Sequence, residues 1–194
     1  KGSFTVSTEF INLLVDLYQN VDTFSIDRFG PFDLKQIYAY LKASHAYYIG
    51  ECLPAISETL DELISKHGSE ADAEKLRKFI KHYKAELHEH IEIEEQVILK
   101  FVNELLSGKY DQGNRDFFFN HFLHTHNDEI ISSLDQIKES IEGNSTLSSD
   151  QTLIKLFELL TALKKDLEIH NLIEDEVFVL KTLDYVNSNF PQQT

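Results

Sequence analysis

The sequence predicts an all-α protein, an antiparallel up-down four-helix bundle preceded by a short extra helix. The 194 residues are enough for one domain with a sizeable core, and the hydrophobic fraction of 42% is ordinary for a globular chain. Glycine and proline number only 7 and 3, so few breaks interrupt the elements. Apolar residues also recur at alternating spacings of three and four along four long stretches, which is the period of an amphipathic helix.

The elements follow from this pattern in chain order. A short amphipathic helix is expected over 5–20, and an irregular connector over 21–31. Four long helices are expected over 33–66, 69–106, 114–142 and 149–187, separated by breaks that contain Gly or Asn. We therefore divide the chain into 1–32, the N-terminal helix and its connector, and 33–190, the four-helix bundle.

Three residues refine the ends and the course of the long helices. Ser69 and Ser149 precede acidic residues at the starts of the second and fourth long helices, which makes them plausible N-caps. Pro54 lies inside the first long helix. Its missing N–H should kink that helix or release a carbonyl there.

Each long helix carries one apolar seam, and each seam includes a histidine. The seam of 69–106 contains Leu76, Ile80, Tyr83, Leu87, His90, Glu94, Val97 and Phe101. The seam of 149–187 contains Leu153, Leu156, Leu160, Leu163, Leu167, His170, Glu174 and Val177. The seams of the other two helices include His45 and His126. Seams of this kind face one another in the core of a bundle.

The sequence also repeats internally. The segments around His90 and His170 both read L-x-x-H-x-x-x-E-x-x-V, and 170 − 90 = 80 residues separate them. His45 and His126 are offset by 126 − 45 = 81 residues. The chain therefore resembles two copies of one helical hairpin, each of which contributes one His and then a His and a Glu.

Six seam residues are the candidate metal ligands. Residues four apart lie about one turn apart on one helix face, so His90 can act with Glu94, and His170 with Glu174. Counting residues from each turn places all the seam His and Glu groups at nearly the same height. The predicted metal ligands are His45, His90, Glu94, His126, His170 and Glu174. Four imidazoles and two carboxylates with open positions suit two iron or manganese ions.

Three alternatives compete with a two-metal site at these residues. A single H-x-x-x-E on a helix is common without a metal, but buried Glu is costly unless it is paired, and here the motif occurs twice on core seams. A ferritin-like site would need Glu-x-x-His on two helices and lone Glu residues on the others, whereas this sequence has the reverse order. A metal-free helical interaction domain is the third hypothesis.

The remaining reactive side chains have simpler interpretations. His67 is expected to meet a helix dipole at a helix end, and His82 and His88 to be solvated. His121 and His124 flank His126 but do not lie on its face. Cys52, the single cysteine, is expected to be a core thiol, because one cysteine cannot form an internal disulfide. Tyr38, Tyr48 and Tyr83 are expected to pack in the core.

The composition also limits the partners. A net charge of −15 argues against nucleic acid or an anionic membrane surface, because both attract positive patches. No apolar run approaches the ~18 residues of a membrane-spanning helix. The lone cysteine is compatible with a reducing compartment, so a cytoplasmic location is expected.

At these residues the sequence resembles the hemerythrin-like (HHE cation-binding) family. The resemblance covers about 33–187 and is closest to the branch with the repair-of-iron-centres (RIC, ScdA-type) proteins. It rests on His45 ahead of Leu53-Pro54, His90-Ile-Glu-Ile-Glu94, His126-Asn-Asp-Glu and His170-Asn-Leu-Ile-Glu174. The resemblance implies an oxo- and carboxylate-bridged pair of Fe ions, with Mn or Zn as substitutes. By the same resemblance, the iron ligands are expected to be His45, His90, His126 and His170, and the bridges Glu94 and Glu174.

Two departures from the family bear on function. Oxygen-carrying hemerythrins have a fifth histidine where this chain has Phe122, which favours the RIC-like branch. RIC proteins often carry a cysteine-bearing N-terminal domain, and the region before residue 33 here has no cysteine. The resemblance implies defence against oxidative or nitrosative stress, through O2, NO or peroxide, or repair of iron–sulfur proteins. The alternative is an oxygen- or iron-binding sensor or storage module without catalysis, and whether the protein is an enzyme stays open.

Overall fold

The computed structural model describes residues 5–68, 71–109, 139 and 149–190. Every regular element in these ranges is helical, so the all-α prediction is confirmed for them. None of the described helices combines the length and the apolar character needed to cross a membrane. Apart from residue 139, the helix expected over 114–142 lies outside the described residues, together with His121, His124 and His126. Ser69 lies outside them as well.

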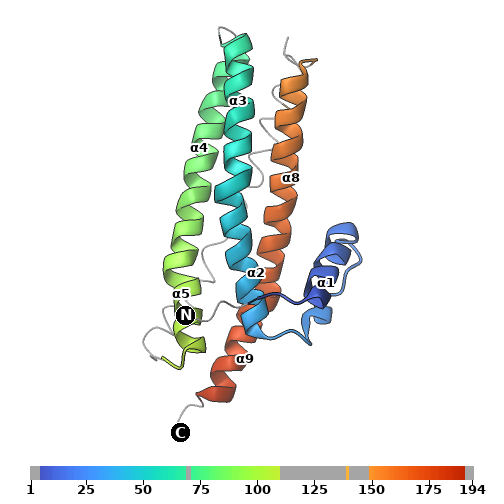
Figure 1. Cartoon of the computed structure of the whole chain (residues 1–194), viewed down its shortest axis with the longest axis vertical. Coiled ribbons are helices and arrows are strands. Elements are labelled where there is room, and N and C mark those ends of the chain that lie inside the picture. The colour runs from blue at the N-terminus through green and yellow to red at the C-terminus, as the bar shows by residue number, and fades with distance from the viewer. Residues whose placement is uncertain (1–4, 69–70, 110–138, 140–148, 191–194) are drawn as a thin grey trace. The chain divides into compact units, whose positions relative to one another are not determined.

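The described elements follow one another in the order shown in Figure 1. The N-terminal part contains α1 (Thr8–Gln19) and a short 3-10 helix, η1 (Ile26–Phe29). The first predicted long helix consists of α2 (Leu34–Tyr47), η2 (Tyr48–Cys52) and α3 (Leu53–His67). The second consists of α4 (Ala71–Ile93), η3 (Glu94–Ile98) and α5 (Leu99–Leu106). The fourth consists of α8 (Gln151–Ile173), η4 (Glu174–Phe178) and α9 (Val179–Asn189).

The elements η2, η3 and η4 are π-turns, which the sequence periodicity did not predict. In η2 the N–H of Leu53 bonds the carbonyl of Tyr48, and in η4 the N–H of Val179 bonds the carbonyl of Glu174. The kink or released carbonyl expected at Pro54 is observed as the π-turn η2. This π-turn ends just before the first turn of α3, which contains Pro54. π-turns inside α-helices occur frequently at functional sites.

Side chains and a glycine define three of the helix ends. The hydroxyl of Ser7 accepts a hydrogen bond from the N–H of Phe10 and caps α1. At the start of α8 the cap is Asp150 rather than the expected Ser149, because its carboxylate accepts from the N–H groups of Thr152 and Leu153. Gly108, at a φ of 75°, ends α5 with the paired backbone bonds of a Schellman motif.

The described chain forms two compact units. Among the described residues, unit 1 contains 5–44, 94–109 and 169–190. Unit 2 contains 45–68, 71–93, 139 and 149–168. Each unit has its own apolar core. The predicted seams of α4 and α8 supply much of the unit 2 core, where α3 and α4 are neighbouring helices (Figure 1).

Unit 1 contains an aromatic cluster that joins α1 to α2. Phe10 of α1 is fully buried, and its ring contacts those of Phe29, Phe32 and Tyr40 with centroids 5.6, 5.1 and 6.0 Å away. These edge-on and tilted arrangements are the favourable ones for aromatic pairs. The cluster therefore anchors the N-terminal helix on the segment that leads into the candidate site.

Polar contacts in unit 2 join η2 and α3 to α8. The hydroxyl of Tyr48 donates to the carbonyl of Asp166 at 3.1 Å. His67, at the end of α3, lies 2.9 Å from the carboxylate of Asp150 at the start of α8. The structural role expected for His67 therefore takes the form of a specific contact between two helix ends.

Candidate metal centre

Four of the predicted ligands are buried side chains at equivalent places in their helices. His45 and His170 lie in the last turns of α2 and α8, where they are 4% and 2% exposed. Glu94 and Glu174 are the first residues of the π-turns η3 and η4, with exposures of 2% and 1%. Carboxylates are almost never fully buried unless they are paired or bind a metal, so these positions need a partner of opposite charge.

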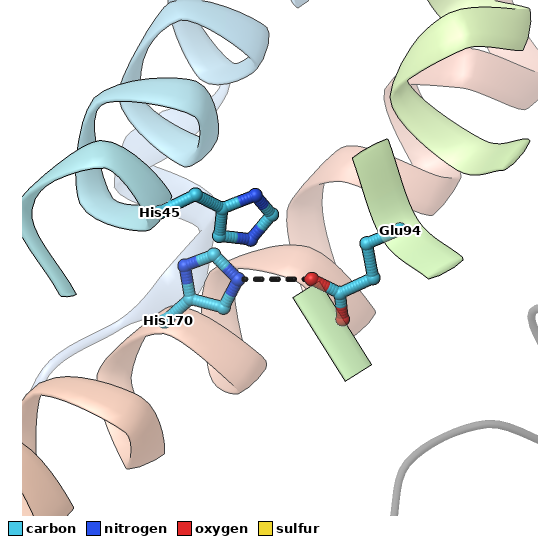
Figure 2. Close-up of side chains that lie close together, drawn as sticks. All are labelled: His45, Glu94 and His170. Carbon is cyan, nitrogen blue, oxygen red and sulfur yellow. Dashed lines mark ion pairs between the residues drawn. The ribbon is translucent and has the colours of Figure 1, made fainter. Parts of the chain in front are cut away.

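Three of these residues converge on one point. His45, Glu94 and His170 each offer a ligand atom, and all three atoms lie within 4.8 Å of one another. Figure 2 shows the two imidazole rings side by side and the carboxylate of Glu94 pointing toward them. The Nε2 atom of His170 lies 3.9 Å from Glu94 Oε2 and 3.6 Å from Glu174 Oε2.

The other side of the His170 ring faces α2. Its Nδ1 atom lies 3.0 Å from the hydroxyl oxygen of Ser44, and its ring centroid lies 6.4 Å from that of Tyr40. The ring is therefore held on one side by a hydroxyl and an aromatic ring, while its Nε2 atom faces the two carboxylates.

The electrostatics of the cluster favour a positive charge. Burial alone would lower the pKa of His170, but the carboxylates of Glu174 and Glu94 outweigh burial and raise this pKa to about 9. Without a metal, the positive charge at neutral pH is thus a proton on the imidazole. A metal cation would take the place of that proton.

The donor set fits a metal ion. Nitrogen–oxygen distances of 3.6 and 3.9 Å are too long for direct hydrogen bonds. Two atoms that share a cation at bond lengths of about 2.1 Å lie roughly 3–4 Å apart, which matches these separations. Two imidazoles with carboxylates are typical ligands of non-haem iron, manganese and zinc. His45, Glu94, His170 and Glu174 are the described residues that would hold such an ion.

The structure does not bring His90 into this group, and it does not describe His126. His90, at the end of α4, is half-buried and is not among the converging ligand atoms of the described residues. His126 lies outside the described residues.

The structure agrees with the simpler interpretation of His82 and His88 and corrects that of Cys52. His82 and His88 are exposed, as expected, and His82 pairs with Glu86 at 3.1 Å. Cys52 is half-buried rather than a fully enclosed core thiol.

Two supporting residues were missed by the sequence analysis. Ser44 contacts His170. The available signal was its position three residues after the buried Leu41, which places it beside the buried stripe of α2. Lys42 binds the carboxylate of Glu95 at 2.5 Å and so joins α2 to η3 beside Glu94. No signal in the sequence pairs these two charges, because 53 residues separate them.

Comparisons with known proteins identify the family. The model of the hemerythrin HHE cation binding domain matches residues 36–181. Searches among curated proteins and among solved structures gave no match. The matched range includes every residue of the converging group, and it covers well over half of the chain. The chain therefore belongs to the hemerythrin HHE cation-binding domain family.

Proposed function

We propose that this protein is a non-haem di-iron protein of the hemerythrin type. The observation that carries the proposal is the buried convergence of ligand atoms from His45, Glu94 and His170, with the carboxylate of Glu174 beside them. In this proposal His45 and His170 would hold one iron, and His90 and His126 would hold a second. Glu94 and Glu174 would be shared by both.

The repeat in the chain supports this pairing. Glu94 and Glu174 follow a histidine by four residues in both copies, and both open a π-turn. Equivalent carboxylates from two copies of one hairpin can bridge two equivalent metals. For the whole domain we propose the arrangement that suits such a pair of bridges, an antiparallel up-down four-helix bundle with an additional N-terminal helix.

The role we propose is defence against oxidative or nitrosative stress, as in the branch of the family that repairs iron–sulfur centres. A bound iron pair would supply redox chemistry toward O2, NO or peroxide. The chain contributes two carboxylates and two imidazoles from residues that are each at most 4% exposed, so bulk water is largely excluded from them. Phe122, in place of a fifth histidine, favours this role over reversible oxygen carriage.

Metal analysis with optical spectroscopy tests the proposal. The full chain, reconstituted with ferrous iron and then exposed to air, should hold close to two irons and show near-ultraviolet charge-transfer bands. Glu174→Gln should lose this iron, whereas Glu176→Gln, a change at an exposed position two residues away, should keep it. A reconstituted chain that holds no iron would contradict the proposal. Iron bound without turnover of NO or peroxide would favour a sensor or a store over an enzyme.

A further inference from the structure

The hydroxyl of Ser44 lies between His170 and the backbone of its own helix. Its oxygen is 3.0 Å from His170 Nδ1, and it is also 2.9 and 3.1 Å from the carbonyl oxygens of Leu41 and Tyr40. A hydroxyl has one proton to donate, and a carbonyl oxygen can only accept. When the Ser44 proton is donated to either carbonyl of its own helix, a lone pair of the oxygen is left facing Nδ1.

In the neutral imidazole, the form that binds a metal, this arrangement favours one nitrogen as the carrier of the proton. Nδ1 faces an acceptor, so Nδ1 is the nitrogen that donates. A neutral imidazole has only one N–H, so Nε2 then presents its lone pair. Nε2 is the atom that faces the carboxylates of Glu94 and Glu174, at 3.9 and 3.6 Å. The hydroxyl thus favours the one tautomer that can bind a cation at the converging point.

We propose that Ser44 is a positioning residue that prepares His170 to bind metal through Nε2. The inference rests on the proposed function, because it concerns the same site. His170 is 2% exposed, so water is a poor substitute for the hydroxyl as acceptor for the buried Nδ1–H. Hydrogen-bond partners of metal-binding histidines typically change metal affinity by about 10- to 100-fold when they are removed.

Cobalt binding to the full chain tests this role. Co2+ titrated against a competing chelator gives the affinity, and its visible spectrum reports the ligand geometry. Ser44→Ala should weaken binding of Co2+ by about 10- to 100-fold. Ser44→Thr keeps a hydroxyl at the same place and should restore most of that affinity. Both Ala and Ser are tolerated within a helix, so the variant should fold.

Ser57 provides a matched control. It is also a half-buried helical serine that donates to the carbonyl four residues earlier, here Leu53 at 2.6 Å, and it contacts Lys84 rather than the site. Ser57→Ala should bind Co2+ as the wild type does. Comparing the melting temperatures of the two metal-free alanine variants separates a general loss of stability from a loss of metal affinity.

A spectroscopic measurement reports the tautomer directly. In the Zn2+-loaded protein, long-range 1H–15N correlation spectra should show His170 with a proton on Nδ1 and metal on Nε2. In Ser44→Ala that Nδ1 proton should exchange faster with solvent and its resonance should shift. An alanine variant with wild-type cobalt affinity and unchanged His170 resonances would overturn the inference and leave the proposed function standing. A wild-type chain that binds no Co2+ would overturn both.

Discussion

The first metal ion to bind should displace a proton, so metal affinity should depend steeply on pH above neutrality. The carboxylates of Glu94 and Glu174 raise the pKa of His170 to about 9, which makes the imidazolium about 100 times more populated than the imidazole at pH 7. A cation must therefore compete against about two pKa units, or about 3 kcal/mol, at that pH. The apparent affinity should rise about tenfold for each pH unit between 7 and 8.5.

The pH range makes the test specific. A histidine with the ordinary pKa of 6.5 is already mostly neutral above pH 7.5, so it would give a nearly flat dependence there. Co2+ affinity measured by chelator competition at pH 7, 7.5, 8 and 8.5 gives the slope. Calorimetry at pH 7 in buffers of different ionisation enthalpy gives the number of protons released, expected to be close to one. His82→Asn, at an exposed position, is the control and should behave as the wild type.

Metal-free stability should change over the same range, with a sign that follows from the raised pKa. A group whose pKa is higher in the folded state stabilises the fold fully below its unfolded pKa of about 6.5, and this contribution is lost as pH rises through about 9. The metal-free protein should therefore melt at lower temperature at pH 9 than at pH 6.5. A flat cobalt affinity from pH 7 to 8.5, with no proton released, would refute the reasoning.

Three further predictions concern the frame around the site. Phe10→Ala should destabilise the protein by about 3–5 kcal/mol in urea unfolding, because it removes a fully buried ring of the aromatic cluster; an unchanged midpoint would contradict this. Hydrogen bonds from His67, the larger cause, and from the Thr152 N–H lower the pKa of Asp150 to about 2. The ionised Asp150 carboxylate therefore stabilises the fold above about pH 4, and this contribution is lost as pH falls through about 2. Asp150→Asn should accordingly lower the melting temperature at pH 7 but not near pH 2, and equal differences at both would exclude this linkage. Glu174→Gln should retain less iron than Glu176→Gln after dialysis against a chelator, and equal retention would remove Glu174 from the ligand set.

The helical class and much of the site follow from the sequence because both depend on local periodicity. The seam of α8 predicted that His170 and Glu174 would be buried, and both are. Heights counted along the chain also predicted that His45 would lie level with them, and the structure brings ligand atoms of His45, Glu94 and His170 within 4.8 Å of one another. The same count placed His90 in that layer. His90 is half-buried, and its place there stays a prediction, because His126, the residue with which it would hold a second ion, lies outside the described residues.

Contacts between distant side chains were beyond such reasoning. A spacing of three or four residues marks Ser44 as close to the core, but it does not state that the side chain meets His170, 126 residues away. The cap of α8 illustrates a smaller limit. Ser149 and Asp150 are both good capping residues by type, and only the local geometry decides that Asp150 takes the role.

The π-turns have a consequence for the history of the chain. In a π-turn the backbone hydrogen bond joins residues five apart, whereas in an α-helix it joins residues four apart. Each π-turn therefore accommodates a single inserted residue. η3 and η4 begin at Glu94 and Glu174, which occupy the same place in the two copies of the repeat. An insertion shared by both copies at the same position is most simply inherited from one ancestral hairpin. The geometry that presents the two carboxylates would then be older than the duplication that brought them together.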